Sequence, residues 1–256
     1  MINSFTGLHA GYYDLVYADK PYAVEASFVL AQVEQLLGRR PRTLLDVACG
    51  TGRHAAEFAA AGIEVTGVDL NEQLLERARE RSPDIEFIQQ DMTELDLRDA
   101  RFEAVTCLFD SIGYPQRNEL VIATLDAARR HLAADGVLAV EFLNAPAMIM
   151  HSAPLRVRRW DTGDGGELLR ISETRLDLAV QVMHVDYELI ELRSDGSFEQ
   201  SRERQSNRFF SVPEMGALMA AGGLELQAAV SAYEDAPEIG ADTFHVLALA
   251  RPAGGT

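Results

Sequence analysis

One segment, residues 43 to 69, constrains the fold of this chain more than any other. An apolar run from Thr43 to Val47 leads directly into a loop that contains Gly50 and Gly52. A helical stretch follows, and a second apolar run ends at Asp69. Glycine lets a chain turn sharply and bring its backbone close to a ligand, and an acid at the end of the second strand can bind the diol of a ribose. The segment therefore predicts a strand–loop–helix–strand unit with a ligand at its loop, although the glycines alone would also fit an ordinary tight turn.

Strands and helices continue to alternate beyond this unit as far as Pro146. Such alternation predicts a parallel sheet with right-handed crossovers. After Pro146 the rhythm changes, and a hairpin signal, Asp195-Gly196, stands between long runs of alternating polarity. Three long strands are expected there, at residues 168–176, 180–192 and 198–210. A helix and two further strands then complete the chain.

The expected fold class is α/β. It comprises a Rossmann-like seven-stranded core, N-terminal helices and an inserted antiparallel β-sheet. We assign residues 1–40 to a helical lid. Residues 41–146 and 211–256 form the cofactor-binding core. Residues 147–210 form the antiparallel insertion, which we expect to cap a substrate site or to form a dimer surface.

Composition excludes several classes of function. The chain carries 40 acidic and 23 basic residues, a net charge of −17. This balance argues against a nucleic-acid or anionic membrane surface, because both need clustered Lys and Arg. Two cysteines cannot form a disulfide framework, which favours a reducing, cytoplasmic setting. The histidines and cysteines show no metal-ligand spacing, so we expect no metal site.

Two cofactors fit the glycine loop. Gly50-x-Gly52-x-x-Ala55 matches the dinucleotide fingerprint, which would make the chain an NAD-dependent oxidoreductase. Asp46 argues against that reading, because a diphosphate needs a loop free of negative charge. S-adenosylmethionine (SAM) brings an ammonium and a sulfonium instead, and an acid suits both cations. The charge of the loop therefore favours SAM.

Four motifs carry a resemblance to the class I SAM-dependent methyltransferases: LLDVACGTGRH (44–54), VTGVDLN (65–71), QQDMTEL (89–95) and VTCLFDSIGY (105–114). A closer resemblance also includes Tyr-Asp-Leu-Val (13–16) and the β-rich insertion. It is to the bacterial N-methyltransferases that act on nucleotide-linked amino sugars in natural-product biosynthesis. Glycine and sarcosine N-methyltransferases share parts of the pattern.

The resemblance implies a methyltransferase core, SAM as the cofactor, a small-molecule acceptor and a homodimer. It also implies roles for particular residues around the cofactor. Asp46, Ala48, Gly50 and Gly52 would lie at the methionine moiety, Asp69 at the ribose, and Leu70, Asp91 and Met92 at the adenine. The carbonyl of Leu108 would meet the ammonium beside Phe109, and Tyr13 and Tyr22 would close over SAM.

The acceptor side departs from the amino-sugar pattern. Those enzymes read Ser-Ser-Ile-Gly-His, whereas this chain reads Asp110-Ser111-Ile112-Gly113-Tyr114, and Phe5 stands where a tyrosine is expected. We assign catalytic roles to Asp110 and Tyr114, as a base or a group that shapes the pocket. The acceptor is a nitrogen or an oxygen of a small, sugar-type or natural-product molecule. A protein of this fold that binds SAM without transferring a methyl group stays an alternative. The residues assigned to acceptor binding are Phe5, Ser111, Glu141, Asn144, Trp160 and Arg208.

Overall fold

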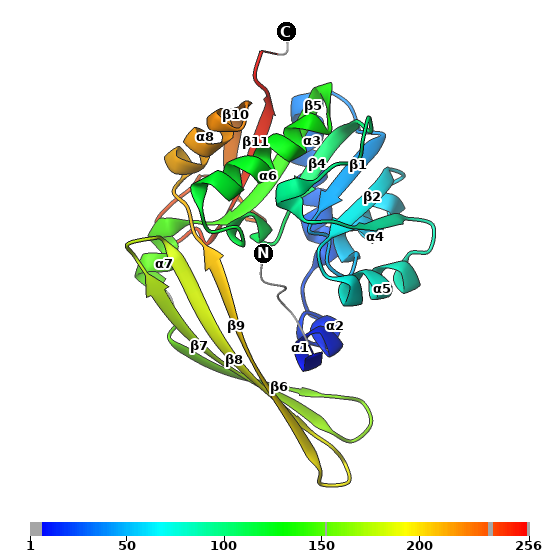
Figure 1. Cartoon of the computed structure of the whole chain (residues 1–256), viewed down its shortest axis with the longest axis vertical. Coiled ribbons are helices and arrows are strands. Elements are labelled where there is room, and N and C mark those ends of the chain that lie inside the picture. The colour runs from blue at the N-terminus through cyan, green and yellow to red at the C-terminus, as the bar shows by residue number, and fades with distance from the viewer. Residues whose placement is uncertain (1–6, 152, 235–237, 255–256) are drawn as a thin grey trace.

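The structure is a computed structural model that describes residues 7–151, 153–234 and 238–254. Its larger part is a seven-stranded sheet with the strand order β10-β11-β5-β4-β1-β2-β3 (Figure 1). The five central and early strands pair in parallel, and β11 is antiparallel to both β5 and β10. These strands are β1 (Thr43–Val47), β2 (Glu64–Asp69), β3 (Glu86–Gln89), β4 (Phe102–Cys107), β5 (Leu132–Leu143), β10 (Leu224–Ser231) and β11 (His245–Pro252).

Helices cover both faces of this sheet, because its strands carry apolar side chains on both sides. One face packs against α3 (Tyr22–Leu37), α4 (Arg53–Ala60) and α5 (Glu72–Arg81) through side chains such as Val29, Phe58 and Leu75. The other packs against α6 (Asn118–Arg130) and α8 (Val212–Ala221) through Leu125 and Met215. Three short elements complete this part: η1 (Met92–Glu94), η2 (Ser111–Gly113) and α7 (Ala145–His151).

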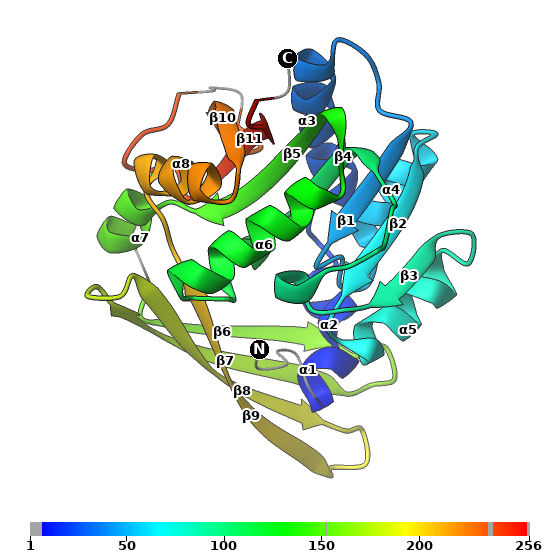
Figure 2. The same ribbon diagram turned by 45° about the horizontal axis from the view of Figure 1, so that its top comes forward.

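A separate antiparallel sheet follows α7, with the order β6-β7-β8-β9. Its strands are β6 (Leu155–Asp161), β7 (Glu167–Asp177), β8 (Val182–Leu192) and β9 (Phe198–Arg208). Figure 2 shows this sheet beneath the α/β core, with α1 (Gly7–Gly11) and α2 (Tyr13–Val16) lying against it. Val16 of α2 packs on Leu168 and Leu189, so the N-terminal helices join the two sheets.

The predicted fold class is confirmed, with one difference in the insertion. Three strands were expected there and four are present. The strand that was not predicted is β6. Its sequence is Leu-Arg-Val-Arg-Arg-Trp-Asp, and it is exposed along nearly all of its length. An edge strand rich in arginine shows little apolar periodicity, so its sequence does not predict a strand. Within the described residues, the structure contains no helix long and apolar enough to span a membrane.

Candidate functional site

A cavity of about 230 Å³ lies at the carboxyl ends of β1, β2 and β4. Ligands of open α/β sheets bind at this edge. The loops after these strands form its floor, the N-terminal helices form one wall, and the inner face of β8 and β9 forms another. The lining residues from the loops include Asp46, Ala48, Gly50, Thr51, Asp69, Leu70, Asn71, Gln90, Met92, Leu108, Phe109, Asp110, Ser111 and Tyr114. Those from the other two walls include Tyr13, Tyr17, Tyr22, Met183, Val185, Tyr187, Gln205 and Asn207.

The glycine loop follows β1 in a left-handed conformation. The φ angle is 57° at Gly50 and 70° at Gly52, values that favour glycine. A Cβ on Gly52 would also stand 2.9 Å from the ring of Phe87, so this glycine lets α4 pack closely. Gly52 shapes the loop in this way without lining the cavity.

Asp69 holds the glycine loop against the end of β2. Its carboxylate accepts hydrogen bonds of 2.8 Å from the backbone N–H of Gly50 and of Asn71. Each carboxylate oxygen has a second lone pair, and the residue lines the cavity beside Leu70. A ribose diol bound here could therefore donate hydrogen bonds to a carboxylate that is already held in place.

Asp46 lies under the same loop and is 2% exposed. The hydroxyl of Thr106 donates to its Oδ1 at 2.8 Å. Burial raises the pKa of Asp46 to about 6, while nearby His54 and the Thr106 hydrogen bond oppose the rise. An acid at the base of the cavity repels a diphosphate and attracts a cationic group, which is the fit expected of SAM.

Asp14 joins α2 to the glycine loop. Its Oδ1 accepts hydrogen bonds from Thr51 Oγ1 at 2.8 Å and Arg53 Nε at 3.1 Å, and Arg81 binds its Oδ2. Burial opposes ionisation, but the hydrogen bonds from Arg81, Thr51 and Arg53 outweigh it, so the pKa of Asp14 lies below its usual value. These bonds hold the tyrosines of the N-terminal helices over the cavity.

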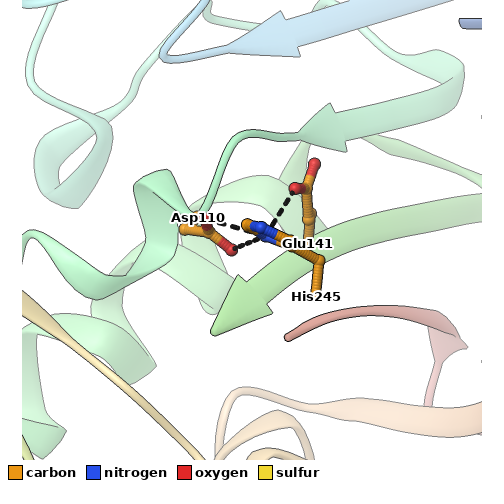
Figure 3. A group of neighbouring side chains, drawn as sticks. All are labelled: Asp110, Glu141 and His245. Atoms are coloured by element: carbon orange, nitrogen blue, oxygen red, sulfur yellow. Dashed lines mark hydrogen bonds and ion pairs between the residues drawn. The ribbon is translucent and has the colours of Figure 1, made fainter. Parts of the chain in front are cut away.

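Asp110 belongs to a charged group beside the cavity, in which two buried carboxylates meet a partly exposed imidazole (Figure 3). It follows β4 with a φ of 57°, and its carboxylate lies 3.1 Å from Nδ1 of His245. The same nitrogen lies 3.2 Å from Oε1 of Glu141, whose Oε2 accepts from Tyr233 Oη at 2.5 Å and from the Phe109 N–H at 2.9 Å. Two carboxylates therefore share one imidazole.

Each charge in this group affects the pKa of its neighbours. The charge of Asp110 raises the pKa of His245 to about 11, against the effect of burial. Burial would raise the pKa of Glu141, but the hydrogen bond and charge of His245 lower it to about 2. Burial raises the pKa of Asp110, with His245 opposing the rise. A protonated His245 thus forms ion pairs with two buried acids and offsets one of their two negative charges.

The same three residues offer one ligand atom each within 4.8 Å of one another. This spacing would allow a metal ion, although the sequence prediction was that the chain binds none. In the structure the three groups instead satisfy one another as an ion-paired network. A metal would have to displace the proton of His245, whose raised pKa opposes that exchange.

The structure brings together most of the residues predicted to bind the cofactor. Asp91 does not line the cavity, because its Oδ1 accepts from the N–H and hydroxyl of Thr93 and caps η1. The predicted residues that line the cavity are Tyr13, Tyr22, Asp46, Ala48, Gly50, Asp69, Leu70, Met92, Leu108, Phe109, Asp110, Ser111 and Tyr114.

Four residues predicted to bind the acceptor lie outside the cavity lining, and Phe5 lies outside the described residues. Glu141 bonds within the network of Figure 3. Asn144 donates to the carbonyls of Thr243 and Gly240, and Trp160 packs against Arg170. These side chains are engaged in contacts with other parts of the chain, so their predicted contact with an acceptor is not supported.

Arg208 is also a correction. Its guanidinium is buried and donates to the Gln116 carbonyl at 2.9 Å, to Asn118 Oδ1 at 2.6 Å and to Glu214 Oε1 at 2.5 Å. These bonds fix the end of β9 to α6 and α8. Arg208 was assigned to acceptor binding, but in the structure its buried guanidinium braces β9 against its neighbours.

Several cavity residues were missed. Tyr17 comes from the segment after α2, and five others come from alternate positions of β8 and β9: Met183, Val185, Tyr187, Gln205 and Asn207. The period-two pattern in β8 was visible in the sequence. What the sequence lacked was the direction in which that face points, which depends on how the second sheet docks.

Known proteins resemble the chain in both sequence and structure. Residues 44–148 match the family profile described as a methyltransferase domain. The dTDP-3-amino-3,4,6-trideoxy-alpha-D-glucopyranose N,N-dimethyltransferase of Streptomyces venezuelae is 39% identical over 137 residues, which cover 52% of this chain and 56% of the relative. The chain thus spans about half the length of the curated relatives it matches.

Solved structures extend the likeness over the whole fold. The crystal structure of DesVI from Streptomyces venezuelae has a TM-score of 0.80 and 28% identity, and covers 96% of this chain and 98% of that one. SAM-bound CalS10, an amino pentose methyltransferase from Micromonospora echinaspora, has a TM-score of 0.77 and 24% identity, and covers 99% and 100%. The latter likeness shows the fold alone. In sequence and fold the chain is therefore similar to SAM-dependent methyltransferases, and the relatives that it resembles include an amino-sugar N,N-dimethyltransferase.

Proposed function

We propose that this protein transfers a methyl group from SAM to a nitrogen, or an oxygen, of a small, sugar-type molecule. One observation carries the proposal: a single cavity joins the glycine loop and Asp69 at one end to Asp110 and a group of tyrosines at the other. A donor and an acceptor can therefore lie in one enclosed space. The named activity of the Streptomyces venezuelae relative, an amino-sugar N,N-dimethyltransferase, supports the same class of acceptor.

Bound SAM supplies an electrophilic methyl group on a sulfonium. The protein's part is to position the acceptor, exclude water and manage one proton. Holding reactants at roughly 3–3.5 Å in line accounts for about 7–11 kcal/mol of the barrier at best. The three-sided cavity and its tyrosine wall serve that positioning role.

Asp110 and Tyr114 have different roles in the proposed reaction. Asp110 is a cavity carboxylate held by His245, so it can accept a proton from an ammonium or hydroxyl acceptor. Burial raises the pKa of Tyr114 well above its usual value. Its hydroxyl therefore stays protonated at neutral pH and orients the acceptor as a hydrogen-bond donor.

The test is methyl transfer from labelled SAM to a panel of amino sugars, sugar nucleotides and amino acids. Asp110→Asn is expected to lower kcat about 100-fold, the scale of general-base catalysis. Tyr114→Phe is expected to cost less than about tenfold, as the loss of one hydrogen bond. Binding of S-adenosylhomocysteine (SAH) by each variant shows that the cofactor end remains intact. A protein that binds SAH and methylates no acceptor would support the binding-only alternative.

The organisation of the chain supports further parts of the proposal. Residues 1–40 act as a lid, 41–146 and 211–256 as the cofactor-binding core, and 147–210 as a cap whose inner face lines the cavity. The outer side of the insertion exposes Leu155, Val157 and Phe198, each at least 60% exposed, which suits a homodimer surface. The two free cysteines agree with a cytoplasmic protein.

A further inference from the structure

Phe109 and Asp110 form a backbone turn that other parts of the protein hold in place. Their φ angles are 55° and 57°, in the left-handed region that favours glycine. Other residues adopt this conformation at a cost in free energy, and it persists where surrounding groups fix it, often at active sites. Because Asp110 lines the cavity, the groups that hold this turn also place its carboxylate there.

Two side chains from distant strands bind the backbone of this turn. Oε2 of Glu141, on β5, accepts a hydrogen bond of 2.9 Å from the Phe109 N–H. Nδ2 of Asn207, on β9, donates one of 3.1 Å to the Asp110 carbonyl. Glu141 is 1% exposed, and Tyr233 Oη donates to the same oxygen at 2.5 Å. The turn is therefore held from both sheets, and Glu141 acts on it from outside the cavity lining.

His245, on β11, binds the side chain of the same aspartate. Its Nδ1 lies 3.1 Å from the Asp110 carboxylate and 3.2 Å from Oε1 of Glu141, and one oxygen of each acid lies within 4.8 Å of the other. Figure 3 shows the imidazole between the two carboxylates. An opposite charge at this range favours the ionised form of a carboxylate, and a like charge disfavours it. The pKa of Asp110 follows this rule: burial raises it, His245 lowers it and Glu141 raises it.

Further titratable groups face the two acids. Lys20, which pairs with Glu25, favours the ionised form of both. Burial raises the pKa of Tyr114, of Tyr233 and of Cys107 above their usual values, so these three groups stay neutral near pH 7. The imidazole and the second carboxylate therefore have a larger effect on the aspartate than Lys20 has.

We propose that Glu141 and His245 are positioning residues for methyl transfer, which hold the Asp110 carboxylate at the cavity and set how readily it accepts a proton. This inference rests on the proposed function, in which Asp110 takes the proton of the acceptor. The N–H or O–H bond of the acceptor breaks, its electron pair bonds the methyl carbon, and the carbon–sulfur pair stays on the sulfur. The proton forms an O–H bond with Asp110 and passes to water after the product leaves. His245 stays protonated throughout, so its charge favours the ionised carboxylate that begins each turnover.

The experiment measures the titration of Asp110 directly and needs no turnover. The full chain is isotope-labelled at the aspartate carboxyl carbons, and its NMR signals are followed against pH with and without SAH. Asp110→Asn identifies the signal of Asp110 by its loss. His245→Gln removes the cation, so Asp110 should bind its proton about tenfold more tightly and titrate about one pH unit higher. Glu141→Gln keeps an oxygen for the Phe109 N–H but removes the like charge, so Asp110 should titrate about one pH unit lower.

His151→Gln and Glu103→Gln are the matched controls. The side chain of His151 is 40% exposed, against 38% for His245, and it pairs with Asp242. Glu103 is 8% exposed and lies at the start of β4, whose other end leads to Asp110. Both variants should leave the titration of Asp110 unchanged.

The wild-type protein gives a second measurement in case His245→Gln does not fold. With labelled histidine, the ring of His245 should be protonated on both nitrogens near pH 8, and in Asp110→Asn it should lose its proton at a lower pH. A neutral ring in the wild type would overturn the inference. An Asp110 titration that is unchanged, or that moves in the same direction, in folded His245→Gln and Glu141→Gln would also overturn it.

Turnover provides an independent readout. Because only ionised Asp110 accepts a proton, the acidic limb of the kcat profile should move to higher pH in His245→Gln and to lower pH in Glu141→Gln. A purely structural role would lower kcat alike at every pH and leave the limb in place, which would contradict the inference. If the wild type methylates no acceptor, the proposed function fails, whereas the NMR titration still tests how these two residues act on Asp110.

Discussion

At the residue scale, Asp69 has two tasks that one carboxylate can perform together. It fixes the glycine loop through Gly50 and Asn71, and it faces the cavity where a ribose would lie. Asp69→Asn replaces one carboxylate oxygen with an NH2 group. This group repels the backbone N–H that the oxygen had bound, and it cannot accept a hydrogen bond from a diol. We expect SAH affinity to fall by about 1.5–3 kcal/mol, the scale of charged hydrogen bonds. Titration calorimetry measures it, with exposed Asp84→Asn as a control expected to bind as the wild type does.

His245 makes a second residue-scale prediction, because its pKa is raised to about 11 in the folded state. The unfolded chain releases this proton near its ordinary pKa of about 6.5, whereas the folded chain holds it. The stabilisation is therefore complete below that value and is lost as pH rises through about 11. The free energy of unfolding should fall between pH 7 and pH 11, as measured by urea denaturation.

His245→Gln should remove much of that pH dependence and destabilise the protein by about 1–3 kcal/mol at pH 7. This is below the cost of breaking a fully buried pair, because the side chain is 38% exposed. His151→Gln is the control, since it breaks an exposed His–Asp pair with Asp242 and should change little. An unchanged pH profile in His245→Gln would contradict the ion-paired network.

At the element scale, Asp14 ties α2 to the glycine loop through Thr51 and Arg53. Asp14→Asn weakens its bonds to Arg53 and Arg81 while it retains the shape of the side chain. SAH should then dissociate about three to ten times faster, the range for partly buried charged contacts. Stopped-flow dissociation measures this rate. Asp19→Asn, an exposed neighbour, should leave it unchanged, and equal rates in both variants would argue against a lid held by Asp14.

The contact between η2 and β9 makes another prediction at this scale. A Cβ on Gly113 would overlap Asn207 and the backbone of Arg208. Because the backbone cannot yield as a flexible side chain can, Gly113→Ala should destabilise the protein by about 3 kcal/mol or more. Thermal unfolding tests this. Gly240→Ala, whose Cβ would meet nothing within 4 Å, should retain wild-type stability. A normal melting temperature in Gly113→Ala would show that the insertion does not dock here.

The elements also show where sequence reasoning stops. The seven-stranded core was predictable because its central strands are apolar and its strands are separated from one another by helices or turn signals. Strand β6 was not, because its arginines and Asp161 conceal the alternation. Helix α3 and the strand ends were predictable from local pattern. The pairing of Asp110 with His245, which lie 135 residues apart, depends on β11 lying beside β5 and has no local signal.

At the scale of the whole molecule, most residues predicted to bind the cofactor line the cavity, whereas most of those predicted to bind the acceptor do not. Cofactor residues follow strands in one fixed order, so a motif such as Asp46 to Gly52 places them. The other cavity residues come from a second sheet whose docking is set by long-range packing, for example of Val16 on Leu189. Glu141 and Arg208 therefore proved structural, while Tyr187 and Asn207 proved to line the cavity.

The most direct test of the central claim is titration calorimetry of the purified protein with SAH, with NAD as the parallel ligand. The cavity places Asp46 beneath the glycine loop, where it favours a cationic methionine moiety and opposes a diphosphate. We predict micromolar binding of SAH and no binding of NAD. Binding of NAD without SAH would contradict the assignment of the cavity and make an oxidoreductase the better description of this fold.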